Sequence, residues 1–144
     1  MLVSQILKDK AVDGIRTLPA TAAVTDAIKI MSDNKIGTVV ISADGDTPEG
    51  ILSERDVVRE LGKRGDAALD GTVGQMMTKD PITCTGTHTA LQVLEMMTEG
   101  RFRHMPVMDA GKMIGLISIG DAVKARLAEL SMEKDALEGM IMGH

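Results

Sequence analysis

The chain has almost no aromatic residues. Of its 144 residues Phe102 is the only aromatic one, and Trp and Tyr are absent. The core must therefore be built from aliphatic side chains and from the twelve methionines, whose flexible side chains adapt to irregular gaps. Cysteine is equally scarce, because Cys84 is the single example. One cysteine excludes a disulfide within the chain and suits a reducing compartment, which predicts a cytoplasmic protein.

Long apolar runs and an excess of positive charge are also missing. No apolar stretch approaches the roughly 18 residues of a membrane-spanning helix, and no apolar segment follows a basic start as it does in a signal peptide. The formal net charge of −5 argues against nucleic acid or an anionic membrane as a partner. With 44% hydrophobic and 26% charged residues, the composition is that of an ordinary globular protein.

One ten-residue phrase occurs twice in the chain, as GILSERDVVR at 50–59 and as GLISIGDAVK at 115–124. The surrounding sequence repeats as well, because VSQIL at 3–7 matches VGQMM at 73–77. Apolar residues with helical spacing occur at 24–31 and again at 90–97. The segments KIGTVVI (35–41) and RFRHMPV (101–107) follow at the same offset. The chain is therefore an internal duplication.

Each copy predicts a short strand (near Ile15 or Ile82), a helix, two strands joined by a turn, and a final helix. The turns are expected at 43–49 and 109–114, where glycine and aspartate gather. One copy is too small to form a stable core. We therefore expect an α/β fold in which two β-α-β-β-α repeats pack their sheets together as one pseudo-two-fold symmetric domain. The predicted boundaries are 1–66 and 71–128, followed by a C-terminal helical extension at 129–144.

The predicted final helix continues beyond the second copy with apolar residues at alternating spacings of four and three. Lys134 interrupts this row, whose apolar members are Val123, Leu127, Leu130, Leu137 and Ile141. Such a spacing is typical of a helix that packs along another helix. The row fits either a partner helix or the body of the same chain.

Each repeated phrase contains a serine followed three residues later by an aspartate, namely Ser53 with Asp56 and Ser118 with Asp121. One interpretation is a capping box, in which both side chains satisfy free backbone N–H groups at a helix start. Another is a nucleoside phosphate site, since a helix N-terminus and a hydroxyl suit phosphate and a carboxylate suits the ribose diol. The two roles are compatible, because one carboxylate can support its helix and also face a cleft.

The duplicated pattern and both phrases resemble a tandem pair of cystathionine beta-synthase (CBS) domains, often called a Bateman module, over roughly residues 1–127. The resemblance implies a sensor that binds AMP, ATP, S-adenosylmethionine or NAD-type ligands in clefts between the repeats. It also implies a homodimer, because such pairs commonly form half of a flat disc. The family's site residues correspond to ribose contacts from Asp56 and Asp121, to Ser53 and Ser118 near phosphate, and to the basic pair Arg103 and His104, with Arg101 nearby.

The two copies differ at these positions. Gly37 and Thr38 stand where the second copy has Arg103 and His104, whereas Arg55 stands in the first phrase where the second has Gly120. The two clefts are therefore expected to differ in occupancy or in ligand.

These features favour a non-catalytic sensor that binds AMP, ADP, ATP or NADH, requires no cofactor and acts on an unidentified partner protein. The alternatives are a structural dimerisation module with empty clefts and a sensor of S-adenosylmethionine. An enzyme is not expected, because neither repeat supplies a nucleophile with a base beside it. Cys84 and His88 could form a metal or nucleophilic pair, but a buried structural thiol is expected, and no metal site is predicted.

Overall fold

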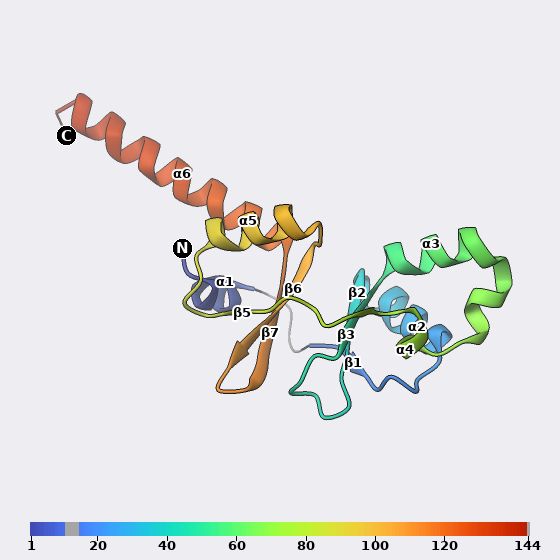
Figure 1. Cartoon of the computed structure of the whole chain (residues 1–144). Coiled ribbons are helices and arrows are strands. Elements are labelled where there is room, and N and C mark those ends of the chain that lie inside the picture. The colour runs from blue at the N-terminus through green and yellow to red at the C-terminus, as the bar shows by residue number, and fades with distance from the viewer. Residues whose placement is uncertain (11–14, 144) are drawn as a thin grey trace.

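The computed structural model describes residues 1–10 and 15–143, which form two similar halves side by side (Figure 1). In sequence, the first copy contains α1 (Val3–Asp9), β1 (Thr17–Leu18), α2 (Val24–Asn34), β2 (Thr38–Ile41), β3 (Gly50–Ser53), α3 (Glu54–Arg64) and the 3₁₀ helix η1 (Gly65–Asp70). The second copy contains α4 (Val73–Met76), β4 (Thr78–Lys79), β5 (Cys84–Thr85), α5 (Ala90–Gly100), β6 (His104–Asp109), β7 (Lys112–Ser118) and α6 (Ile119–Ile141). The predicted β-α-β-β-α order is confirmed in both copies, with a C-terminal helix.

The predicted positions differ from the observed ones by a few residues. The first strand of each copy, expected near Ile15 or Ile82, lies at Thr17–Leu18 and Cys84–Thr85. The second turn is shorter than the range 109–114, because it consists of Ala110 and Gly111, with φ of 50° and 79°. Two consecutive residues with positive φ make a tight hairpin turn whose twist matches that of the strands. The residues that follow it therefore belong to β7.

The strands form one sheet in each half. The first sheet has the order β1-β2-β3-β4 and the second has the order β5-β6-β7. In both, the first strand runs parallel to the second, and the following pairs are antiparallel. Strand β4 lies in the segment that leads into the second copy, yet it pairs with β3 of the first copy, Ile51 opposite Thr78. The two copies are therefore interlocked through their leading segments.

The leading helix of each copy likewise packs in the apolar core of the other half. Val3 and Ile6 of α1 are buried in the core of the second half, where Val3 N donates to His88 O at 2.8 Å. Val73 and Met76 of α4 are buried in the core of the first half, where the Val73 amide likewise donates a backbone hydrogen bond. Neither copy has a complete core without the other, which explains why the sequence contains both.

The glycine that opens each repeated phrase lies where a leading segment crosses a strand. A Cβ on Gly50 would meet the Met77 sulfur and would lie 2.9 Å from Thr78 O, a backbone atom held in β4. A Cβ on Gly115 would lie 2.7 Å from the end of the Leu7 side chain. Both glycines therefore permit close approach of the exchanged segments, a role that helix capping does not require.

This difference predicts that Gly50→Ala destabilises the fold more than Gly115→Ala. A backbone oxygen in a paired strand cannot turn aside, whereas a leucine side chain can change rotamer. Overpacking of this kind costs about 1–3 kcal/mol, so we expect a clear loss of stability for Gly50→Ala only. Chemical denaturation of both variants measures it, and equal losses would refute the assigned contact.

Helix α6 begins in the second core and ends beyond the body of the protein. Ala122 and Ala125 are buried against that core, whereas the helix projects away from the body towards its C-terminus (Figure 1). The row that begins with Val123 is exposed. The sequence left open whether this row packs against a partner helix or against the body of the same chain. In the structure the row does not pack against the body. Among the described residues, no helix is both long and apolar enough to cross a membrane.

Candidate functional site

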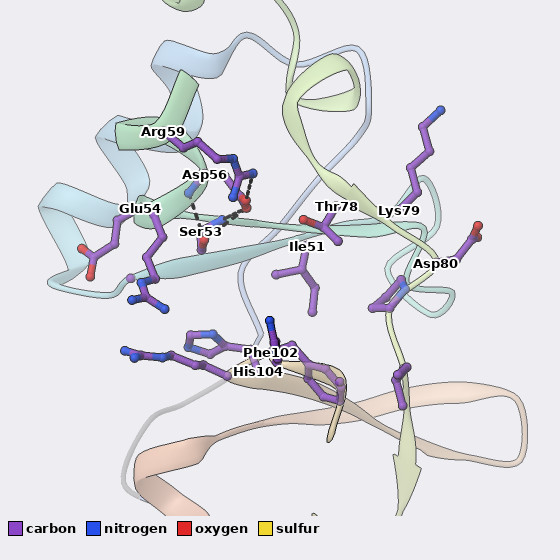
Figure 2. A pocket seen from close by; sticks show the side chains of 17 residues that line it. Ile51, Ser53, Glu54, Asp56, Arg59, Thr78, Lys79, Asp80, Phe102 and His104 are labelled. Atoms are coloured by element: carbon purple, nitrogen blue, oxygen red, sulfur yellow. Dashed lines mark hydrogen bonds and ion pairs between the residues drawn. The ribbon is translucent and has the colours of Figure 1, made fainter. Parts of the chain in front are cut away.

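A cleft of about 690 Å³, here called cleft 1, lies between the two halves. The first copy contributes Ser53 and Asp56 from the junction of β3 and α3, and the second contributes Phe102 and His104 from the entry to β6. Figure 2 shows these two groups on opposite sides of the space, with Ile51 pointing across it. Cleft 1 therefore combines the phrase of the first copy with the strand entry of the second.

The predicted capping boxes are confirmed at both helix starts. In cleft 1, one oxygen of Asp56 accepts hydrogen bonds from Ser53 N at 2.9 Å and from Ser53 Oγ at 3.1 Å. The other oxygen accepts from Arg59 Nη2 at 2.7 Å. The Asp56 side chain is only 8% exposed, whereas that of Arg59 is 52% exposed. A ligand hydroxyl reaching Asp56 would therefore either share this carboxylate with the half-exposed Arg59 or displace Arg59 from it.

Cations outnumber carboxylates around cleft 1. Its carboxylates are Glu54, Asp56 and Asp80, and its cations are Arg55, Arg59, Lys79, Arg101 and Arg103. Guanidinium groups bind phosphate oxygens through paired hydrogen bonds. The remaining wall is apolar and includes Phe102, Ile51 and Ile82. The apolar wall can therefore pack against a flat ring, and the Asp56 carboxylate can accept hydrogen bonds from a diol. The several arginines can bind a phosphate.

A second cleft of about 430 Å³, here called cleft 2, lies between the phrase of the second copy and the strand entry of the first. It joins Ser118 of the second copy to Arg16 and Thr38 of the first. Its basic residues are Lys10, Arg16, Lys35 and His104, and none of the described residues that line it is Asp or Glu. Arg16 donates to Asn34 Oδ1 at 3.2 Å. Cleft 2 therefore suits an anion, and the described part of its lining offers no carboxylate to a ribose.

Asp121 lies beside cleft 2 and is bound by a lysine of the same chain. Lys10 Nζ donates to Asp121 Oδ2 and to Leu116 O, both at 2.8 Å. Burial raises the pKa of Asp121, but the hydrogen bonds from Lys10 and Ser118 outweigh it and lower the pKa below its ordinary value. The Asp121 carboxylate is thus ionised, and the Lys10 ammonium group balances its charge. Both aspartates are therefore ion-paired, but Asp56 is paired with the half-exposed Arg59 of its own helix, whereas Asp121 is paired with Lys10, which is only 24% exposed.

His104 lines both clefts. Burial lowers the pKa of His104, and the cations of Lys10 and Arg103 lower it further, against the opposing effects of Asp121 and Glu54. The imidazole is therefore neutral at pH 7 and can become a cation when an anion enters either cleft.

We expect His104 to make the fold less stable in acid. The unfolded imidazole takes up a proton near pH 6.5, whereas the folded one does so only at a lower pH. Stability therefore falls as the pH drops from 6.5 through the lowered pKa, because the unfolded state binds more protons in this range. The melting temperature should fall less steeply between pH 7 and pH 5 for His104→Gln than for the unchanged chain. Equal slopes would mean that His104 titrates normally.

Cys84 and His88 do not form a reactive pair. The thiol is buried, and burial raises the pKa of Cys84 to about 11. His88 Nδ1 instead accepts a hydrogen bond from Thr85 N at 3.0 Å. The expected buried thiol is confirmed. Among residues 1–10 and 15–143, no group of three or more His, Cys, Asp and Glu side chains is arranged to hold a metal ion.

The structure brings most of the predicted residues together in cleft 1. They are Ser53, Arg55, Asp56, Arg101, Arg103 and His104. Ser118 lines cleft 2, and Asp121 stands behind it. Sequence reasoning missed Lys10 and Lys79, which belong to the exchanged leading segments, because nothing local shows which half they join. It also missed Arg59, although its position one helical turn after Asp56 was a usable signal.

Comparison with known proteins agrees with this architecture. The CBS domain family model matches residues 3–63 and 73–128. The crystal structure of the CBS-domain containing protein ATU1752 from Agrobacterium tumefaciens superposes with a TM-score of 0.81 at 40% identity, covering 88% of this chain and 99% of that one. The CBS domain protein PAE2072 from Pyrobaculum aerophilum, complexed with AMP, superposes with a TM-score of 0.72 at 27% identity over 84% and 89% of the two chains.

Curated relatives of this chain include plant proteins. The mitochondrial CBS domain-containing protein CBSX3 of Arabidopsis thaliana is 34% identical over 98% of this chain and 72% of its own length. CBSCBSPB1 of the same plant is 28% identical over 85% of this chain, which spans only 22% of that relative. The chain belongs to the CBS domain family and carries a tandem pair. Such pairs are regulatory modules that bind nucleotides.

Proposed function

We propose that the protein is a non-catalytic sensor that binds an adenosine nucleotide in cleft 1. The observation that carries the proposal is the composition of that cleft, where one buried carboxylate, an apolar wall and several arginines meet. The base packs against Phe102 and Ile51, the ribose diol donates to Asp56, and the phosphate accepts from Arg103 and Arg55. The AMP complex of PAE2072 supports an adenosine ligand. AMP is the first candidate among AMP, ADP, ATP and NADH.

The serine of the phrase has a secondary role in this proposal. Ser53 Oγ donates to Asp56 and accepts from Asp56 N at 3.2 Å, so both its donor and one acceptor site are used by the cap. It must rotate before it can donate to a phosphate. Cleft 2 is the weaker site, because a ribose must first displace Lys10 from Asp121.

In this proposal the protein is a homodimer, and the homodimer passes the signal to a partner protein. The protein needs no cofactor for this role. A cytoplasmic location also remains a prediction, and the mitochondrial name of one relative makes the organelle an alternative to test by fractionation.

A sensor with a different ligand is the second candidate. S-adenosylmethionine shares the adenosine part of the proposed ligand but carries a cation where AMP carries phosphate. The cation excess of cleft 1 favours AMP. Mass spectrometry of small molecules released by denaturing the purified protein tests the choice. We expect an adenine nucleotide, whereas S-adenosylmethionine would support the alternative, and no bound adenosine compound would favour a structural module.

A further inference from the structure

An apolar row on α6 lacks cover in the single chain. We call this row the α6 stripe; its exposed members are Val123 (40%), Leu127 (62%), Leu130 (44%), Leu137 (60%) and Ile141 (84%). The buried Ala122 and Ala125 lie on a different side of the same helix, so the body of the protein does not block the stripe. Contiguous exposed apolar surfaces of this kind mark interaction sites.

We propose that the α6 stripe packs antiparallel against the α6 stripe of a second copy of this chain. The inference takes the homodimer from the proposed function and assigns it a surface and an orientation. It is independent of the nucleotide.

The spacing of the stripe allows a complete antiparallel seam. The residues of the stripe alternate between the a and d positions of a heptad. In an antiparallel pair of helices, each a position packs against a d position of the partner. Val123 then lies opposite the partner's Ile141, and Leu127 opposite the partner's Leu137. Leu130 lies opposite the partner's Lys134, whose methylene stem can cover it while the ammonium group reaches water.

Charge decides the orientation of the two helices. Lys124 and Glu138 flank the α6 stripe on the same side, one near each end. An antiparallel pair brings Lys124 beside the partner's Glu138, and two-fold symmetry makes this contact twice. The antiparallel register also places Glu133 beside the partner's Glu133 at the two-fold axis, which is one repulsive contact. A parallel pair instead brings Glu133 beside the partner's Glu138, a repulsive contact that two-fold symmetry makes twice, and it offers no attractive contact for Lys124 and Glu138 in return. Antiparallel packing also aligns opposite ends of the two helix dipoles.

The first test separates the stripe from the rest of the helix. Leu137→Glu puts a charge into the stripe, and Met132→Glu is the matched control, because Met132 is 68% exposed on the opposite side of α6. By light scattering at tens of micromolar, we expect twice the chain mass of 15.3 kDa for the unchanged protein and for Met132→Glu. Leu137→Glu should dissociate at least about tenfold more readily. A monomeric unchanged protein would overturn the homodimer altogether, whereas a dimer that survives Leu137→Glu would overturn only the α6 assignment.

The second test determines the orientation by disulfide trapping. Chains carrying Lys124→Cys are mixed with chains carrying Glu138→Cys under mild oxidation. We expect a cross-linked pair from the mixture and little from either variant alone. A cross-link between Glu133→Cys and Glu138→Cys chains, with none between Lys124→Cys and Glu138→Cys chains, would show parallel helices and overturn the proposal. Cys84 does not compete, because it is buried and its pKa is raised to about 11.

Discussion

Asp56→Ala is expected to weaken AMP binding by roughly 10-fold to 150-fold. A hydrogen bond to a charged group contributes about 1.5–3 kcal/mol, and Asp56 is the carboxylate that cleft 1 presents to a ribose from the first phrase. Titration calorimetry on the folded variant gives the affinity directly. Because Asp56 also caps α3, the variant will lose about 0.5–2 kcal/mol of stability as well, and this loss must be measured separately.

Asp121→Ala is the matched control for this prediction. Both aspartates close equivalent capping boxes, and in both the serine amide donates to the carboxylate at 2.9 Å. The two variants therefore lose the same helix cap, but they differ in the cation that a ribose must displace, which is the mostly buried Lys10 at Asp121 and the half-exposed Arg59 at Asp56. We expect the affinity of the tighter site, cleft 1, for AMP to change by no more than about twofold in Asp121→Ala. Equal affinity losses in the two variants would contradict the assignment of the main site to cleft 1.

Arg103→Ala is expected to distinguish a nucleotide from its nucleoside. Removing one charge-assisted contact to the phosphate should weaken AMP binding by about 1.5–3 kcal/mol. Adenosine lacks the phosphate, so its affinity for the variant should match its affinity for the unchanged protein. Titrations of both ligands at two salt concentrations measure the difference. A parallel loss for adenosine would mean that Arg103 shapes the cleft and does not bind the phosphate.

The sequence was sufficient to predict the β-α-β-β-α elements of each copy because local signals define them, but it did not predict the leading helices α1 and α4 or the strand β4. Heptad-like spacing marked α2 and α5, and Ser-x-x-Asp marked the starts of α3 and α6. The two-residue hairpin at Ala110 and Gly111 was not foreseen, since it depends on two successive positive φ angles. Such angles are hard to infer for an alanine.

The pairing between copies could not be read from the sequence, because an exact repeat does not reveal which core each leading helix joins. The exchange of α1 and α4 determines that Asp56 faces the arginines of the other copy and that Lys10 reaches Asp121. The residues of the candidate site and a difference between the two clefts were therefore predictable, whereas the ion pairs Lys10–Asp121 and Arg59–Asp56 that distinguish the clefts were not.

Thermal unfolding with and without adenine nucleotides tests the central claim most directly. A nucleotide that binds only the folded chain adds about 2.7 kcal/mol at a concentration of one hundred times its dissociation constant. For a chain of this size, that corresponds to a rise in melting temperature of roughly 5–11 °C. We predict such a rise with at least one of AMP, ADP, ATP and NADH, and a smaller rise in Asp56→Ala. A melting temperature that stays within about one degree for all four at millimolar concentration would contradict the account.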